Sequence, residues 1–124
     1  MTETGENVLW RKLAAALLLI GIALGAFGAH LLPKKLGASF NADVWDTAVF
    51  YHLIHGLALF ILALRGTKVG RFVKIILLAG ILCFSGSLYG LAVDNSLKFL
   101  GPITPLGGLL FMTGWATLIF KKSL

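Results

Sequence analysis

Histidine and tyrosine side chains recur inside stretches of this chain that are otherwise apolar. The histidines are His30, His52 and His55, and the tyrosines are Tyr51 and Tyr89. An imidazole can carry a proton, ligate a metal or haem iron, or hydrogen-bond a quinone carbonyl. The same side chains can also tie helices to one another by hydrogen bonds. Their spacing therefore predicts either a site of this chemistry or a structural network.

Four apolar stretches without Asp, Glu, Lys or Arg must position these side chains: residues 13–32, 47–64, 75–93 and 103–120. Each is about as long as a helix needs to cross ~30 Å of hydrocarbon at ~1.5 Å per residue. Hydrophobic residues make up 58% of the chain and charged residues 13%, far from the balance of a soluble domain. We expect an all-α, integral membrane four-helix bundle that forms a single transmembrane domain over residues 1–124, with helices at about 10–32, 42–65, 71–93 and 102–121.

The first stretch is too long for the core of a typical signal peptide, so we expect it to be retained as the first helix. Pro33 and Gly37 are expected to interrupt that helix, and Asn41 is a suitable N-cap for the second. Residues 33–46 would then form an outer connection.

The basic residues determine the expected orientation. Four spans put both termini and the middle loop on one side, with eight Lys and Arg residues there against three on the other. This bias places both termini in the cytoplasm. Although the net charge is +6, the basic residues lie at helix ends and not along one stripe, which argues against nucleic acid as a partner. The larger group is Arg11, Lys12, Arg65, Lys68, Arg71, Lys74, Lys121 and Lys122.

With this orientation, the polar side chains of all four helices lie toward the outer leaflet. The candidate polar cluster is His30, Tyr51, His55, Ser85, Ser87, Tyr89 and Thr104. An imidazole or phenol without a partner costs several kcal/mol in hydrocarbon, so we expect these groups to face inward and bond one another. His55 lies near the middle of its span, and we expect it to face the third helix within reach of Ser85 or Tyr89.

Glycines are expected to form the helix contacts, because small residues let backbones approach closely in lipid. Packing inside one bundle is the favoured interpretation, with a dimer interface or a close cofactor as the alternative. The candidates are Gly21, Gly25, Gly28, Gly86, Gly90, Gly107 and Gly108.

Motifs of enzymes are absent from the sequence, which contains no nucleophile elbow, phosphate-binding loop or Cys-x-x-Cys pair. The single cysteine, Cys83, cannot form an intramolecular disulfide. His52 and His55 supply only two metal ligands at helical spacing, and no carboxylate lies in the core. We expect no catalytic residues, no metal and no cofactor.

Four segments in series carry a specific pattern: Gly25 to His30, Tyr51 to Leu59, Phe84 to Tyr89, and Thr104 to Gly108 with Gly114-Trp115 after it. Together they resemble the signature of the domain-of-unknown-function 423 family of small membrane proteins, over residues 13–118. The resemblance implies four transmembrane helices in a bacterial inner membrane, a related eukaryotic branch and no established activity. It also implies that position 52 often holds another polar residue, so a site that requires His52 is not expected. The positions that resemble the family most closely are His30, His55, Ser85, Ser87, Tyr89, Thr104, Pro105, Gly107 and Gly108.

We therefore expect a non-enzymatic membrane protein whose outer-half cluster stabilises the bundle or binds a small ligand or partner. Membrane lipids surround it, and a homo-oligomer or a membrane-protein partner stays open. One alternative is a small oligomeric transporter or proton-conducting element that uses His55 and Tyr89 as relay groups. Another is a metal-, haem- or quinone-binding protein that uses His30 with His55.

Overall fold

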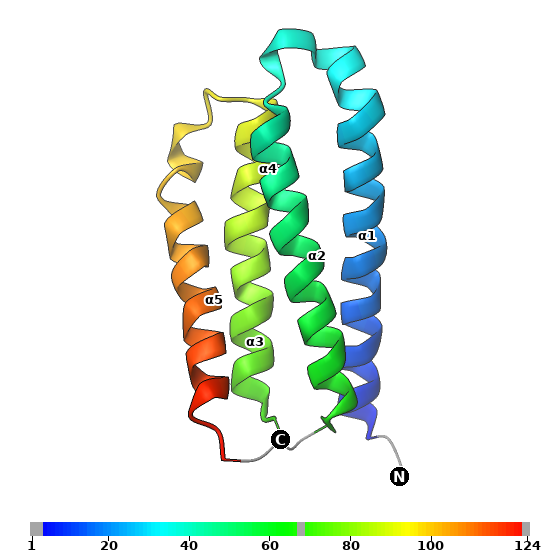
Figure 1. Cartoon of the computed structure of the whole chain (residues 1–124), viewed down its shortest axis with the longest axis vertical. Helices are drawn as coiled ribbons and strands as arrows, with labels where there is room; N and C mark the ends of the chain where they lie inside the picture. The colour runs from blue at the N-terminus through cyan, green and yellow to red at the C-terminus, as the bar shows by residue number, and fades with distance from the viewer. Residues whose placement is uncertain (1–3, 67–68, 123–124) are drawn as a thin grey trace.

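The computed structural model describes residues 4–66 and 69–122, so Lys68 lies outside the described residues. Four long helical rods run alternately up and down, and the first and last described residues lie at the same end (Figure 1). The rods are α1 (Gly5–Leu36), α2 (Ala42–Leu64), a third made of α3 (Arg71–Gly80), the π-helix η3 (Ile81–Ser85) and α4 (Gly86–Val93), and α5 (Ile103–Ile119). Short 3-10 turns, η1 (Gly37–Ser39) and η4 (Lys98–Leu100), lie in the two connections at the opposite end.

Each rod is long and apolar enough to cross a membrane: Gly5–Ser39, Ala42–Leu64, Arg71–Val93 and Lys98–Ile119. The predicted all-α membrane bundle is thereby confirmed. At ~1.5 Å per residue, the 32 residues of α1 extend about 48 Å, well beyond a hydrocarbon core of ~30 Å. The C-terminal end of α1 accordingly projects past the other rods (Figure 1).

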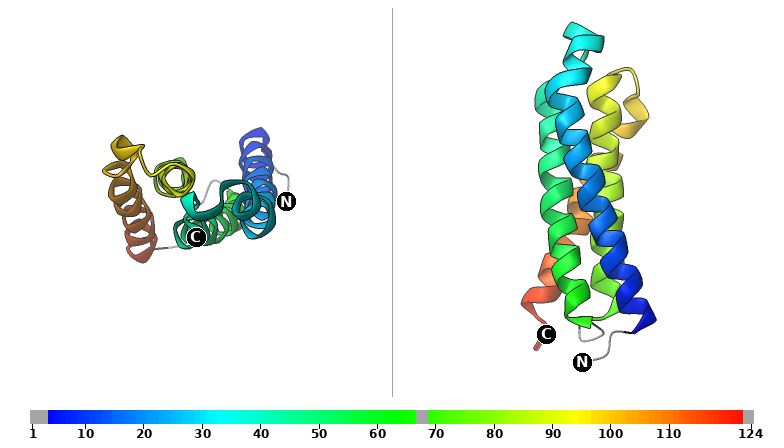
Figure 2. Two further views of the ribbon diagram at one scale, coloured as in Figure 1. Left: turned by 90° about the horizontal axis from the view of Figure 1, so that it is seen from above. Right: turned by 90° about the vertical axis from the view of Figure 1, so that its right-hand side faces the viewer.

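The rods stand in an open, zigzag row, with α1 and α5 at its two ends (Figure 2, left). Each rod packs mainly on its neighbour in the chain: α1 on α2, α2 on the third rod, and the third rod on α5. Burial follows this order, since 39% and 33% of the apolar windows of the two central spans are buried, against 11% for α1 and 17% for α5. The two central spans are therefore more enclosed than the two end rods.

Two predictions about the first connection had different outcomes. Asn41 is the N-cap of α2, as predicted, because its side-chain oxygen accepts a hydrogen bond from the backbone N–H of Val44 at 3.1 Å. The prediction that Pro33 interrupts the first helix is wrong, since α1 continues to Leu36 and ends at Gly37, whose φ is 58°. Pro33 lies in the exposed last turn, where water can satisfy the carbonyl that loses its partner. The predicted 33–46 connection shrinks accordingly to residues 37–41.

The third rod is not a uniform α-helix, because Ile81–Ser85 is π-helical. This segment lies where α5 comes closest: a Cβ added to Gly107 would overlap the backbone of Phe84. A π-helical turn contains more residues than an α-helical turn, so it changes which side chains of α3 and α4 share a face. Ser85 thereby faces α2, where its hydroxyl donates to the carbonyl of Ala48 at 2.8 Å.

Candidate functional site

His52 connects three rods through its two ring nitrogens. Nε2 lies 2.8 Å from the carbonyl oxygen of Leu17 on α1, and Nδ1 lies 2.8 Å from the hydroxyl of Tyr89 on α4. Because a carbonyl only accepts, Nε2 carries the proton and donates it. In the neutral ring, Nδ1 then accepts from the Tyr89 hydroxyl. Both nitrogens are thus occupied within the chain.

Trp45, seven residues before His52 on α2, makes a parallel contact with α1. Its indole Nε1 donates to the carbonyl of Leu24 at 2.8 Å. Each accepting carbonyl on α1 is followed four residues later by a glycine, Gly21 after Leu17 and Gly28 after Leu24. The side chain at that later position lies beside the carbonyl. Glycine therefore leaves the oxygen open to a second donor.

The space beside these two glycines is filled by the donors themselves. A Cβ at Gly28 would overlap the Trp45 indole, and a Cβ at Gly21 would come 2.6 Å from a methyl of Leu53 and 3.3 Å from the His52 ring. The two glycines and two donors form a repeated unit, which we call the carbonyl-glycine contact (Gly21, Gly28, Trp45 and His52). This contact attaches α1 to α2 by two hydrogen bonds.

His55 belongs to a different contact, between α2 and α5. Its Nε2 accepts from the indole Nε1 of Trp115 at 3.0 Å, and its ring stacks on Phe111 with centroids 3.6 Å apart. Because an indole N–H only donates, Nε2 of His55 is unprotonated. Nδ1 then donates to the carbonyl of Tyr51 at 2.9 Å. His55 is therefore the opposite tautomer to His52.

The hydroxyls of Ser85, at the end of η3, and of Ser87, in α4, lie on two different faces of the third rod. Ser85 bonds Ala48 on α2, whereas Ser87 bonds the hydroxyl of Thr104 in the first turn of α5. This division follows from the position of α4 between α2 and α5 in the row.

The structure thus separates the predicted cluster into distinct pairs. The prediction that His55 pairs with Ser85 or Tyr89 is wrong, since its partners are Trp115 and a carbonyl of its own helix. His30 does not join the others either. It is exposed, and six residues beyond Leu24 it lies level with the connection that precedes α2. The position of His30 in the apolar stretch 13–32 suggested that it lies near the other polar side chains. Because α1 is longer than that stretch, His30 lies beyond them.

The predicted packing glycines also divide. Gly21, Gly28, Gly90 and Gly107 lie where an added Cβ would meet another element at close range, whereas Gly25 and Gly108 would make only ordinary contacts. The prediction for Gly86 is wrong: a Cβ there would meet nothing within 4 Å, because Gly86 points outward between the buried Ser85 and Ser87.

His52 is the residue that the sequence prediction placed outside the site. A signal for it was present, because donors seven residues apart on α2 face glycines seven residues apart on α1. Antiparallel helices bring equally spaced residues to matching levels. This matched spacing identifies both Trp45 and His52.

Tyr51 differs from every other hydroxyl within the four described spans. The hydroxyls of Thr47, Ser85, Ser87, Tyr89, Thr104, Thr113 and Thr117 all make internal hydrogen bonds, as does that of Ser39. Within residues 4–66 and 69–122, the Tyr51 hydroxyl makes none, although its ring packs 4.6 Å from Phe84. Tyr51 is 37% exposed.

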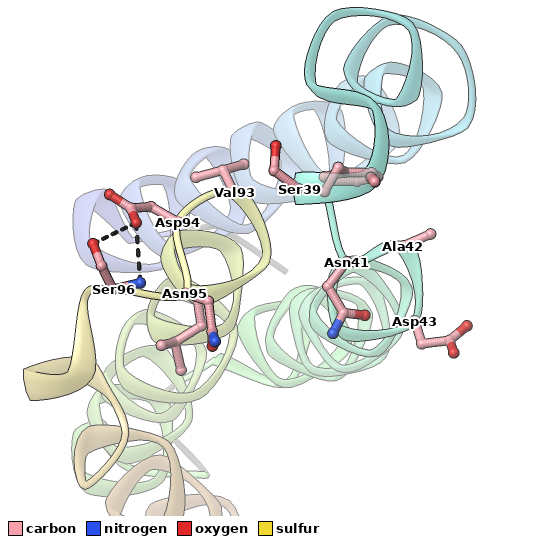
Figure 3. Close-up of a pocket in the computed structure, with 11 residues that line it drawn as sticks. Ser39, Asn41, Ala42, Asp43, Val93, Asp94, Asn95 and Ser96 are labelled. Atoms are coloured by element: carbon pink, nitrogen blue, oxygen red, sulfur yellow. Dashed lines mark hydrogen bonds between the residues drawn. The ribbon is translucent and has the colours of Figure 1, made fainter.

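A polar cleft of about 660 Å³ lies at the end of the bundle opposite the termini (Figure 3). The α1–α2 connection and the loop after α4 form it, joined by a hydrogen bond from the Asn41 N–H to the Ala92 carbonyl at 2.9 Å. Asp94 accepts hydrogen bonds from the Ser96 hydroxyl and backbone N–H, which hold the pKa of its carboxyl below the usual range. The lining includes Ser39, Asn41, Asp43, Asp94, Asn95 and Ser96.

Metal chemistry finds little support in this geometry. Among the described residues, no three His, Cys, Asp or Glu side chains lie close enough to hold an ion. Each buried histidine already directs both nitrogens at partners in the chain. A haem or metal bound by His30 with His55 would need these two side chains together, and the structure keeps them apart.

Comparison with known proteins places the chain among membrane proteins. It is 41% identical over 106 residues to the UPF0382 membrane protein YwdK of Bacillus subtilis, covering 82% of this chain and 85% of that protein. It is 37% identical over 113 residues to the UPF0382 membrane protein C1782.12c of Schizosaccharomyces pombe, covering 87% and 96%. A Haemophilus influenzae UPF0382 membrane protein is 42% identical over 103 residues, covering 80% and 81%.

No solved structure matches this chain. The family described as "Protein of unknown function (DUF423)" matches residues 24–108, which include the carbonyl of Leu24, Gly28, both buried histidines and Thr104. This match, together with relatives of about 40% identity over most of the chain, shows that the chain belongs to the DUF423 family of integral membrane proteins.

Proposed function

We propose that this integral membrane protein is non-enzymatic and that its buried polar side chains serve to hold the helices in their row. The observation that carries the proposal is that His52 and His55 each use both ring nitrogens in hydrogen bonds within the chain. A histidine that carries protons, ligates a metal or binds a ligand needs one nitrogen free or exchangeable.

Energetics favour this role for the carbonyl-glycine contact. Apolar burial does not drive helix association in lipid, whereas interhelical hydrogen bonds contribute roughly 0.6 to 2 kcal/mol each. The bonds from Trp45 and His52 add two directed links to the packing of α1 on α2.

Proton conduction is the weaker alternative. The chain of donors from Tyr89 through His52 ends on the carbonyl of Leu17, and that from Trp115 through His55 ends on the carbonyl of Tyr51. A backbone carbonyl cannot pass a proton onward. A relay would therefore need other groups, supplied by an oligomer or by water.

The proposal includes the bacterial inner membrane as the location, with both termini in the cytoplasm, on the strength of the eight basic residues at the termini end. A reporter fused after Leu124 tests this orientation: activity of a cytoplasmic reporter supports it, and activity of a periplasmic reporter overturns it.

The central experiment compares His52→Phe and His55→Phe with the unchanged chain in detergent and in liposomes. We expect both variants to lower the melting temperature, and we expect the unchanged chain to show neither proton flux nor a metal or haem signal. Tyr51→Phe is the matched control, because its hydroxyl makes no internal bond in the described chain. A histidine variant that melts normally but loses flux or a bound group would overturn the proposal.

A further inference from the structure

A cavity of about 550 Å³ lies at the termini end of the bundle, between the first turns of α1 and the start of α3. It is lined by Gly5, Glu6, Leu9, Trp10, Leu13 and Arg71. Charged groups lie at its outer edge and leucines extend along α1 into the membrane-spanning part. This order matches that of a phospholipid, which has a charged headgroup above apolar chains.

Arg71 supplies donors that the described residues do not use. Its Nε donates to the Glu6 carboxylate at 2.7 Å, which joins α3 to α1. The terminal guanidinium nitrogens make no hydrogen bond within residues 4–66 and 69–122, and the side chain is 69% exposed. A guanidinium held in this way presents its remaining N–H groups in the geometry that suits a phosphate.

Trp10 provides a second, independent observation. Its side chain is only 8% exposed and lines the cavity, yet its indole N–H has no acceptor in the described part of the chain. One turn earlier, the side-chain oxygen of Asn7 is buried and also without a partner there. Asn7 does not line the cavity, so the group open to a ligand there is the Trp10 indole N–H, a donor that an acceptor such as a phosphate oxygen can meet.

The surrounding charge favours an anion. Lys74 is 1% exposed, with Nζ 5.7 Å from the centre of the Trp10 ring and 3.5 Å from the carbonyl of Gly66. The α1 N-terminus adds the positive end of its helix dipole at the same place. Among the described residues that line the cavity, the one carboxylate is Glu6, which is already paired with Arg71.

We propose that this cavity binds the phosphate of a membrane phospholipid headgroup, with the Arg71 guanidinium and the Trp10 indole N–H as donors and an acyl chain along Leu9 and Leu13. Leu9 is 66% exposed, so a chain can lie against it from the bilayer. The proposal requires only that the chain spans a membrane, and it is independent of the role of the buried histidines.

Native mass spectrometry of the full chain, purified in mild detergent and supplied with phosphatidylglycerol, tests the proposal. Arg71→Gln is expected to reduce lipid retention roughly tenfold, since it removes a charge-assisted contact. Trp10→Phe keeps the ring and removes the N–H, with an expected loss of roughly threefold. Lys98→Gln, at the opposite end of the bundle, is the matched control and is expected to retain lipid normally.

Two probes separate the parts of the ligand. Diacylglycerol with the same acyl chains lacks the phosphate and is expected not to be retained, and inorganic phosphate is expected not to displace the lipid. The proposal would be overturned if Arg71→Gln and Trp10→Phe retained phosphatidylglycerol as well as the unchanged chain does. Retention of diacylglycerol, or displacement of the lipid by inorganic phosphate, would each overturn it too. If the Arg71→Gln variant does not fold, the double variant Glu6→Gln/Arg71→Gln replaces it, because it exchanges the whole ion pair for neutral amides. Its lipid retention is then compared with that of the unchanged chain in the same way.

Discussion

The two end rods of the row are attached by different physics, although both attachments depend on glycine. At α1, Gly21 and Gly28 leave the carbonyls of Leu17 and Leu24 open to donors from α2. At α5, Gly107 lets its backbone come directly against the backbone of Phe84, and hydrogen bonds from Trp115 to His55 and between Thr104 and Ser87 add to that contact. Glycine thus opens carbonyls to hydrogen bonds at α1, and it permits a close backbone contact at α5.

This difference shows that glycine in a membrane helix has more than one use. A close backbone contact gains dispersion energy over a large area, and it fails when any atom is inserted. A carbonyl opened by glycine gains one directed bond, and it fails when the donor is lost or the opening is filled. Each mechanism therefore predicts its own pattern of sensitivity to substitution.

The largest effect is expected at the α5 contact, from Gly107→Ala. The added methyl would overlap the backbone of Phe84, which cannot rotate away as a side chain can. Overpacking of this kind should cost about 3 kcal/mol or more, measured as the loss of unfolding free energy or melting temperature in detergent. Gly86→Ala is the control, since nothing lies within 4 Å of its added Cβ. Equal stability of the two variants would show that α5 is not packed as described.

The next largest loss of stability is expected at the contact between α1 and α2, and a double-mutant cycle measures it. Gly28→Ala should cost about 2 kcal/mol by displacing the Trp45 indole, and Trp45→Phe about 1 kcal/mol by removing its N–H. Because both act on one contact, their combination should fall short of the sum by about 1 kcal/mol. Gly114→Ala is the control, since Gly114 faces Leu77 and not this contact. The stability costs of Gly114→Ala and Trp45→Phe should therefore be additive. Additive costs for Gly28 and Trp45 would contradict the carbonyl-glycine contact.

The same comparison explains what the sequence could and could not predict. Span number, fold class and the Asn41 cap follow from composition and local spacing, and the structure agrees with them. Gly28 and Gly86 look alike in the sequence, yet one lies against Trp45 and the other points outward. What distinguishes them is the order of rods in the row and the π-helical turn before Gly86, which a constant helical period does not contain.

The hydrogen-bond partners of the buried side chains were harder to predict than the depth of those side chains in their spans. His55 lies as deep in α2 as its position in the span indicated, but whether it meets α4 or α5 depends on rotation of α2 within the row. The bond from Trp115 to His55 depends on which face of α2 meets α5, and local spacing does not contain that information. His30 was misplaced because α1 is longer than its uncharged stretch.

A smaller effect distinguishes two tyrosines that carry the same chemical group. Tyr89→Phe removes the hydroxyl that bonds His52 and should cost about 1 kcal/mol, whereas Tyr51→Phe removes one without an internal bond in the described chain and should leave stability unchanged. Nitrogen-detected NMR gives the second readout. The His52 proton should lie on Nε2 and the His55 proton on Nδ1. Identical tautomers for the two rings would contradict the assigned bonds.

The smallest effect is expected at Gly25, midway between the two glycines of the α1 attachment. An added Cβ there would meet only a methyl of Val49 at 3.4 Å, an ordinary contact, and no side chain of the described residues donates to the carbonyl of Gly21, four residues earlier. Alanine also favours helix by up to about 1 kcal/mol over glycine, so Gly25→Ala should be neutral or slightly stabilising in thermal unfolding. Gly21→Ala, one turn away, is the matched variant and should be destabilising, because its methyl meets Leu53 at 2.6 Å. If both substitutions cost the same, α1 packs on α2 through a uniform small-residue face, and the carbonyls of Leu17 and Leu24 have no special part in holding it.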